Sequence, residues 1–388
     1  MTLKWKTKKS PQFYLDQALE LQINAREPSS LSGSPEFYVW AKCLPYLIDF
    51  PSNIDEQDIN DSIKQALMSC IKSNDLNDKF FIEELSQNIS KKRSRHLIEK
   101  HFETKISISF PNDLMEFKVF NSSIKIYTNK YDAYSRVVVE MKTSSDEHKE
   151  HLNCLNLLRG ILCFFINHGM VIHLPSHQIK EPINRIKLSK NFRLSTKNNI
   201  SIFEKKDEIE KRELVKKNLA DQKHIDNINN FIMKLEGCRY ANTIKQTLLL
   251  YVNALDEVDH NVSFILLWNC LDNLTNSEIG KYDEVINRVS SLYPNVKYHE
   301  VVLDYLRNFR NDFAHRGKKI KDATIFCYTL QEYVRDLIYF HLDNINKFEN
   351  IDAAIKTLAF ISNKKAINVQ TEMHDFVSEL NWRFKKDL

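Results

Sequence analysis

The stretch KYHEVVLDYLRNFRNDFAHRGKKIK, from Lys297 to Lys321, carries a clear helical pattern, and the rest of the sequence is interpreted outward from it. Its apolar residues recur at steps of three and four, the spacing of one buried helical face. These residues are Val301, Val302, Tyr305, Leu306, Phe309 and Phe313. Gly317 predicts the end of the helix, because glycine readily adopts the left-handed conformation found at helix C-termini. The pattern therefore places Arg310, Asn311 and His315 at the end of one helix.

The segment Arg310-Asn311-Asp312-Phe313-Ala314-His315 resembles a motif of HEPN-superfamily ribonucleases, in which arginine, a polar residue and a three-residue spacer precede histidine. The resemblance is to the Apea-like group of phage-defence proteins and covers roughly Cys238 to Leu342. It includes LLWNCLDNL, from Leu266 to Leu274, where Asp272 occupies an acidic position that is more often Glu. Two arginines precede asparagine and the chain has 13 histidines in 388 residues. About 0.07 chance matches to the motif are therefore expected.

The resemblance implies an all-α, HEPN-like helical bundle with ribonuclease activity. RNA is cut without a metal ion when its own 2′-hydroxyl attacks the adjacent phosphorus. A base must accept the hydroxyl proton, and a cation must stabilise the charge that develops on the phosphate. Histidine can be neutral near pH 7, and arginine binds phosphate oxygens through a planar fork of donors. We therefore expect His315 to be the general base or acid, Arg310 to bind the scissile phosphate and Asn311 to orient one of them.

Four further cations and one carboxylate complete the expected site. Arg316, Lys318, Lys319 and Lys321 follow the motif and would hold flanking phosphates, which makes binding sensitive to salt. Asp272 is expected to support the arginine or the histidine. The products would carry a 2′,3′-cyclic phosphate and a 5′-hydroxyl, and DNA would resist cleavage because it lacks the 2′-hydroxyl. No cofactor and no metal ion are expected.

Five residues along a helix correspond to a rise of about 7.5 Å and a rotation of about 140°, so Arg310 and His315 do not share one face. A cleft must bring them together. The family resemblance implies such a cleft, because HEPN domains pair about a two-fold axis. We therefore expect a homodimer formed through the helical domain.

Bulk properties indicate an ordinary globular protein of more than one domain. Hydrophobic residues make up 43% and charged residues 27% of the 388 positions, which excludes a disordered chain. The net charge is only +4, so a polyanion must be held by a local patch and not by the field of the whole molecule. The seven cysteines form no CxxC pair, and reduced, buried thiols are expected. No secretory signal or transmembrane segment is evident, and a cytoplasmic location is expected.

The first part of the chain, residues 1–203, is predicted to be an α+β domain. Helices are expected from Ser10, over Glu36–Ile48, Asp55–Ser73 and Lys79–Phe102, and over Asp146–Asn167. Between Lys105 and Thr143 the apolar residues alternate with polar ones, and the turn clusters PND, NSS and NKYDA separate the runs. This pattern predicts a short antiparallel meander. Further strands are expected at Met170–Leu174 and Ile200–Phe203.

The remainder is predicted to be helical. Residues 204–236 are expected to connect the two halves through charged helices, since EKKDEIEKRELVKKNLADQK, from Glu204 to Lys223, carries charge pairs one turn apart. Residues 237–388 are expected to form the HEPN-like nuclease domain with C-terminal helices. The expected helices after the charged stretch that ends at Lys223 are Ile225–Glu236, Tyr240–Glu257, Val262–Ser277, Tyr282–Ser291, Ala323–Phe348, Ile351–Ser362 and Thr371–Phe384.

By the same resemblance, the setting would be a prokaryotic toxin or an anti-phage abortive-infection system. The N-terminal domain would then respond to a phage or cellular trigger, or to an antitoxin. The alternative is a non-catalytic helical module that binds RNA, a nucleotide or a protein.

Other motifs give no convincing functional site. His148, His151 and Cys154 recur at three-residue steps, but HKEHLNC lacks the HExxH order of zinc peptidases. Phosphate-binding glycine loops and serine or cysteine nucleophile motifs are absent.

Overall fold

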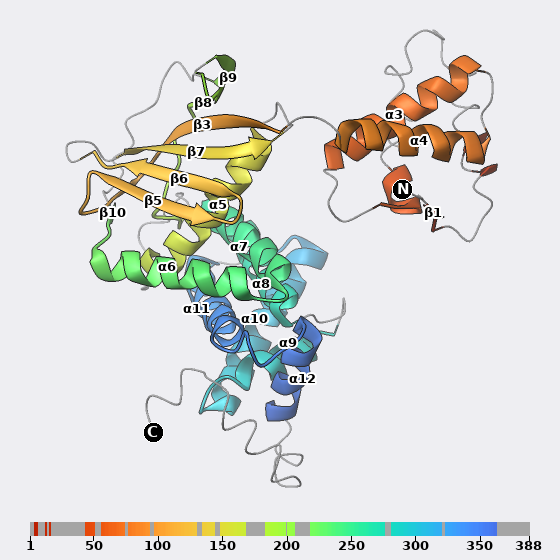
Figure 1. The fold of residues 1–388 in the computed structure, drawn as a ribbon. Helices are drawn as coiled ribbons and strands as arrows, with labels where there is room; N and C mark the ends of the chain where they lie inside the picture. The colour runs from red at the N-terminus through yellow and green to blue at the C-terminus, as the bar shows by residue number, and fades with distance from the viewer. Residues whose placement is uncertain are drawn as a thin grey trace. The chain divides into compact units, whose positions relative to one another are not determined.

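The computed structural model describes residues 4–6, 12–13, 15–16, 43–50, 56–73, 77–93, 97–129, 134–143, 148–167, 183–198, 200–205, 218–275, 281–319 and 323–362. The chain divides into two compact units, Met1–Leu97 and Ile98–Leu388, and each is described by itself. The second unit contains both the sheet and the helices that follow it in sequence (Figure 1).

The first unit is built around two helices, α3 (Glu56–Ser73) and α4 (Asp78–Arg93), which pack against each other. Strands β1 (Lys4–Trp5) and β2 (Ile48–Asp49) pair antiparallel. The apolar side chains of this unit form their own core, made of Leu15, Leu44, Ile48, Ile63, Ala66, Leu67, Cys70, Phe81, Leu85 and Ile89.

The helix expected at Asp55–Ser73 is confirmed by α3, but the helix expected over Lys79–Phe102 is wrong at its C-terminal end. α4 stops at Arg93, and β3 begins at Ile98. The physical reason lies in the alternation of burial along β3. Lys100, Phe102, Thr104 and Ile106 are all buried, and residues between them are more exposed, which is the period of a strand.

A six-stranded antiparallel sheet opens the second unit, with strand order β5-β6-β7-β3-β8-β9 (Figure 1). Its strands are β3 (Ile98–Ile106), β5 (Leu114–Val119), β6 (Ser122–Tyr127), β7 (Ser135–Thr143), β8 (Phe192–Thr196) and β9 (Ser201–Lys205). The predicted meander is confirmed by β5, β6 and β7, which follow one another in sequence and in space. Beside the sheet, β4 (Ile108–Ser109) pairs in parallel with β10 (Asn218–Leu219).

Helices make up the rest of the second unit. They are α5 (Lys149–Ile166), α6 (Gln222–Gly237), α7 (Ala241–Asp256), α8 (His260–Thr275), α9 (Tyr282–Ser290), α10 (Val296–Arg316), α11 (Ala323–Asp343) and α12 (Ile351–Ser362). The predicted order, an α+β region followed by an all-helical region, is confirmed.

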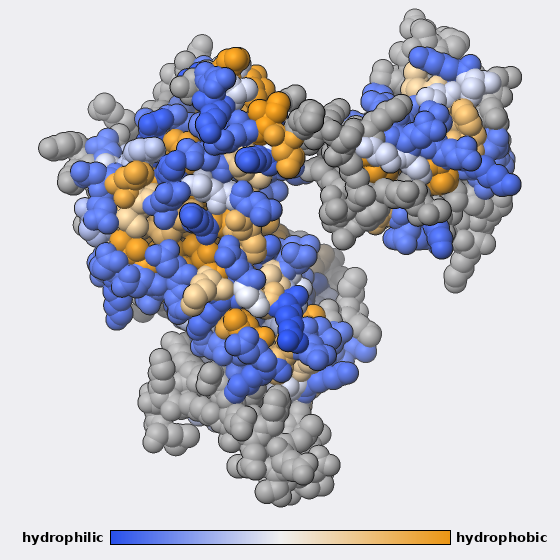
Figure 2. Space-filling view, viewed as in Figure 1, coloured by the Kyte–Doolittle hydropathy of each residue, from blue (hydrophilic) through white to orange (hydrophobic). Residues whose placement is uncertain are grey.

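One continuous core joins the sheet to the helices. It includes Phe102 and Ile124 from the sheet, Leu158 from α5 and Trp268 from α8. Figure 2 shows hydrophobic residues reaching the surface over the strands, in keeping with the partial exposure of Ile98 and Phe203. The domain limits expected at residues 203 and 236 stay predictions.

Several expected elements lie outside the described residues. They are the strand expected at Met170–Leu174, the helix expected at Thr371–Phe384 and most of the charged segment after Glu204. At the edges of the charged segment, Glu204 is in β9 and Asn218 is in β10, so these two positions are strand and not helix.

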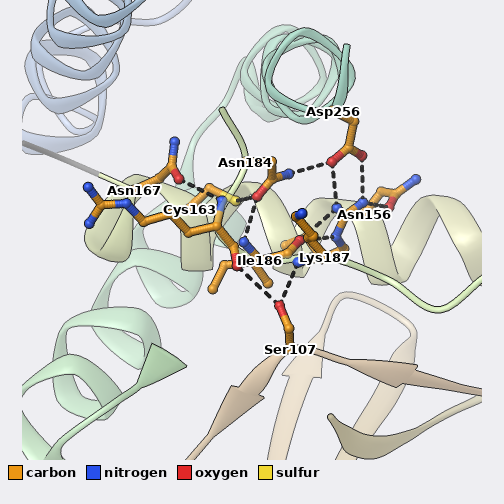
Figure 3. A network of polar contacts seen from close by, with 10 residues as sticks. Ser107, Asn156, Cys163, Asn167, Asn184, Ile186, Lys187 and Asp256 are labelled. Atoms are coloured by element: carbon orange, nitrogen blue, oxygen red, sulfur yellow. Dashed lines mark hydrogen bonds and ion pairs between the residues drawn. The ribbon is translucent and has the colours of Figure 1, made fainter. Parts of the chain in front are cut away.

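A buried polar network ties the sheet to the first helices of the bundle (Figure 3). At its centre is Arg159 of α5, whose side chain is only 3% exposed. The guanidinium donates two hydrogen bonds to Asp256 at the end of α7, at 2.8 and 2.9 Å, and a third to the Ile186 carbonyl at 2.7 Å. Asn184 donates to the same carboxylate at 2.6 Å. An arginine inside an apolar helix is therefore fully paired, as burial of a charge requires.

The same network extends to the sheet and to α11. The Ser107 hydroxyl donates to the Arg185 carbonyl at 3.1 Å and accepts from the Lys187 amide at 2.7 Å. Asn167, directly after α5, exchanges hydrogen bonds with Gln331 of α11, at 2.8 and 2.6 Å. Polar contacts thus connect Ser107 beside the sheet to the segment after residue 183, and the end of α5 to α11.

We expect Asp256→Ala to lower the free energy of unfolding by about 3–5 kcal/mol, because it leaves the buried Arg159 guanidinium without its counter-charge. Urea unfolding, followed by circular dichroism, measures the change. The exposed carboxylate of Glu349 provides a control, since Glu349→Ala should change stability by less than about 0.5 kcal/mol. A loss below about 1 kcal/mol for Asp256→Ala would show that the pair does not hold the unit together.

His341 of α11 is a second buried polar group, and its ring is held neutral. Its Nε2 lies 2.9 Å from the Leu274 carbonyl and its Nδ1 lies 3.2 Å from the Tyr240 hydroxyl. Because a carbonyl only accepts, Nε2 must carry the hydrogen, and Nδ1 then accepts from the tyrosine. Burial lowers the pKa of His341 from 6.5 to about 4.

This low pKa makes stability depend on pH. The unfolded chain binds a proton at His341 below pH 6.5, whereas the folded chain does so only near pH 4. The folded state should therefore lose about 3 kcal/mol from this residue as the pH falls from 6.5 to 4. Unfolding free energies measured across this window should fall less steeply for His341→Gln. If the unfolding free energy of the variant and of the parent fell equally steeply with pH, His341 would not be the source of this pH dependence.

The structure tests the expected burial of the cysteines and the expected absence of a transmembrane segment. All seven cysteines are free, and Cys70, Cys163, Cys238, Cys270 and Cys327 are buried as expected. Cys43 is exposed and Cys154 is half-buried, so the expectation of burial is wrong for these two. Among the described residues, no helix has both the length and the apolar character needed to cross a membrane.

Candidate functional site

The helix that carries the motif, α10, has defined ends. The Asn295 side chain accepts a hydrogen bond from the Tyr298 amide at its start. At its end, Gly317 adopts φ 62°, and its amide donates to the Phe313 carbonyl at 2.9 Å. A left-handed residue here is easily formed only by glycine, so the prediction from Gly317 is confirmed. The end of the motif helix is therefore fixed by the backbone.

α10 buries only part of the face that was expected: Leu306 is buried, and Val302 and Phe309 pack against the core. Leu303 and Leu306 are fully or almost fully buried, whereas Val301 is 70% and Tyr305 is 55% exposed. The expectation that Val301 and Tyr305 belong to the buried face is wrong. The apolar positions of α10 extend more than halfway around the helix, and neighbouring helices cover only part of that arc. Apolar residues are thus left on the surface of the motif helix.

Arg310 lies on the buried side of α10 and faces α9. Its guanidinium carbon is 4.5 Å from the centre of the Tyr282 ring, which is within the range of a cation–π contact. Tyr282 in turn meets Trp268 of α8 edge-to-face at 6.5 Å. Trp268 is fully buried, which confirms that it belongs to the core. Arg310 is thus held in a defined place by an aromatic wall from two neighbouring helices.

Part of the hydrogen-bonding capacity of Arg310 is unused. One Nη is 3.4 Å from the Asn311 amide oxygen, a long contact, and the buried Nε has no hydrogen-bond partner among the described residues. A guanidinium carries five N–H donors in a planar fork. The ring of Tyr282 contacts the guanidinium without using these donors, so the Nη groups remain available to an anion, whereas the Nε is buried. Asn311 is beside the arginine, as its expected orienting role requires.

Asp272 lies on α8, four residues after Trp268 and therefore on the same side of that helix. It is half-buried. Helix periodicity thus places a carboxylate one turn from the tryptophan that supports Tyr282. Its supporting role stays a prediction.

His315 is in the last turn of α10, and its side chain is outside the described residues. Its backbone position is separated from Arg310 by a rotation of about 140° and a rise of about 7.5 Å. Positions 310 and 315 therefore do not lie on one face of α10. Within one chain, the motif is therefore spread around α10.

The cations after the motif are at the surface. The side chains of Arg316, Lys318 and Lys319 are 77%, 72% and 77% exposed. Each is 3.5 Å or more from a carboxylate, Asp312 for the first two and Asp259 for Lys319. Such long, exposed pairs are weak, so these cations can exchange their partners for phosphates. Lys321 lies outside the described residues.

The sequence did not reveal that Tyr282 supports the arginine. It is the first residue of α9, 28 positions before Arg310, and its type and spacing give no signal of the contact. Only the packing of α9 against α10 brings the two together.

The buried cysteines are poor candidates for nucleophiles. Burial raises the pKa of Cys163 and of Cys327 to about 12, so both thiols stay protonated at neutral pH.

No protein-family model, no curated protein and no solved structure matches the chain.

Proposed function

We propose that the chain is a metal-independent endoribonuclease whose catalytic groups are Arg310, Asn311 and His315. The observation that carries the proposal is the placement of Arg310, fixed by Tyr282 with donors to spare, at the same helix end as a histidine and three exposed cations. The resemblance of the motif to HEPN ribonucleases points to the same chemistry.

In the proposed reaction, the 2′-hydroxyl of the substrate attacks the neighbouring phosphorus, and the bond to the 5′-oxygen of the next nucleotide breaks. His315 accepts the hydroxyl proton or donates a proton to the leaving oxygen. Arg310 binds the phosphate and stabilises its growing negative charge. Asn311 orients Arg310 or the phosphate. The products are a 2′,3′-cyclic phosphate and a 5′-hydroxyl, and no metal ion or cofactor takes part.

The RNA strand is proposed to pass over the end of α10, where Arg316, Lys318 and Lys319 neutralise flanking phosphates; Lys321 would add to them. Exposed lysines and arginines bind phosphates by releasing counterions, so affinity should fall with salt. Asp272 is proposed to support the site from α8 through the Trp268 and Tyr282 rings.

A homodimer through the helical domain is part of the proposal. Positions 310 and 315 are about 140° apart on one helix, so a phosphate held by Arg310 of one chain is better reached by His315 of a second chain across a two-fold axis. Each composite site would then contain an arginine and a histidine from different copies.

The proposed setting is the cytoplasm, where the nuclease acts as a toxin or an anti-phage abortive-infection effector. The N-terminal region, with its separate unit and its sheet, would receive the phage or cellular trigger or bind an antitoxin. The choice of RNA substrate would depend on the protein surface next to the end of α10, which the RNA strand would contact.

We expect purified protein to cleave RNA in excess chelator, and Arg310→Ala or His315→Ala to lower the rate at least about 100-fold. Arg310→Lys should also be slow, because lysine keeps the charge but loses the planar fork. Gel assays with a labelled RNA and mass analysis of its ends measure the rate and the product. A matched substrate with a single 2′-deoxy nucleotide at the cut site should stay intact.

Lys297→Ala, at the other end of α10, serves as the control and should leave the rate unchanged. If the parent protein binds RNA but leaves it intact, and expression of the protein does not arrest growth, the chain is a binding module and not an enzyme. Cleavage that requires a divalent metal would also contradict the proposal.

Mixed dimers test whether the site is shared between chains. An equimolar co-expression of Arg310→Ala and His315→Ala should regain about a quarter of the parent activity, because half of the dimers are mixed and each has one intact composite site. Each variant alone should remain inactive. A mixture that stays inactive while light scattering shows dimers would place both catalytic groups of a site on the same chain.

A further inference from the structure

A groove of about 660 Å³ runs between α9 and α10. Its walls include Ile286 and Asp283 from α9 and Glu300, Val301, Asp304 and Tyr305 from α10. The apolar side chains are accessible: Val301 is 70% and Tyr305 is 55% exposed. An exposed valine and tyrosine beside a recess form a surface that binds another apolar side chain.

The polar groups of the groove are predominantly negative. Three carboxylates line it, and the guanidinium of Arg307 pairs with two of them, Asp283 and Asp304. Glu300 makes no ion pair with any described residue. Lys297 is one turn from Glu300. When Lys297 and Arg307 are both counted as positive charges, the negative charges of the carboxylates still exceed the positive ones. The groove thus presents apolar contacts inside a negative field.

This charge decides between classes of partner. A strand of RNA would bring phosphates against Glu300 and Asp304, which is unfavourable. A second copy of the chain centred on the groove would bring the same carboxylates against each other, because a two-fold contact pairs each patch with itself. A polypeptide that carries lysine or arginine around apolar side chains complements both the charge and the apolar wall.

We propose that the groove between α9 and α10 is a docking surface for a basic, amphipathic segment of a partner protein. One or two apolar side chains of the segment rest on Val301, Tyr305 and Ile286, and its cations face Glu300 and Asp304. The groove ends close to the proposed phosphate-binding arginine: from Tyr305 to Arg310 the helix rises about 7.5 Å. The inference does not depend on the ribonuclease activity.

The test uses the full chain and two fluorescent 16-residue peptides. One has leucine and lysine at helical spacing, and the other has glutamate at each lysine position. We expect the lysine peptide to bind in an anisotropy titration at least about tenfold more tightly than the glutamate peptide. Glu300→Lys and Val301→Ser should each weaken the lysine peptide about tenfold. Val301 is exposed and Glu300 is half-buried at the edge of the groove, and circular dichroism of both variants checks that the fold is retained.

Two matched variants control for charge and for loss of an apolar surface residue. Glu349→Lys and Val258→Ser change exposed residues elsewhere and should leave binding of the lysine peptide unchanged. Equal weakening by these variants, or no weakening by Glu300→Lys and Val301→Ser, would overturn the proposal. Weaker binding of single-stranded RNA by Val301→Ser, measured without the peptide, would assign the groove to nucleic acid. If the parent protein does not bind the peptide, and light scattering shows that Val301→Ser has lost a dimer that the parent forms, the groove is a contact with a second copy of the chain.

Discussion

The bidentate pair between Arg159 and Asp256 joins α5 to the end of α7, and the segment that passes beside it carries the contacts to Ser107 next to the sheet. A charge at 3% exposure is tolerated only when it is paired and its remaining donors are satisfied. Here the Ile186 carbonyl and the Asn156 amide oxygen accept those donors. The same contacts fix the segment after residue 183 against α5, so the sheet cannot slide on the helices without exposing the charge. Apolar packing alone would tolerate more than one arrangement.

On this scaffold, α10 combines three different surfaces. One side is buried and carries Arg310 toward Tyr282, its middle exposes Val301 and Tyr305 beside carboxylates, and its end presents cations around Gly317. Charge therefore changes sign along a single helix. A polyanion is attracted to the C-terminal end and repelled from the groove.

The elements with strong periodicity could be predicted from the sequence. The strands β5 and β6 alternate with one face buried, and the end of α10 follows from Gly317. The misassigned segment, residues 98–102, is a strand in which Lys100 is buried. Burial of a lysine depends on neighbours that are distant in sequence, so local spacing gave no sign of it. For the same reason, the exposure of Val301 and Tyr305 could not be anticipated: apolar residues at helical spacing mark which face could be buried, but a neighbouring helix must be there to cover it.

By itself, the sequence determined the order of elements and the group of residues at the end of α10, because periodicity, a glycine stop and the Arg-Asn and His spacing are local properties. Tertiary structure alone decided which way Arg310 faces, that Tyr282 holds it, and that an acidic groove lies beside it. These are contacts between helices separated by tens of residues. They depend on how α8, α9 and α10 pack, and side chains that are far apart in the chain leave no mark on each other's local pattern.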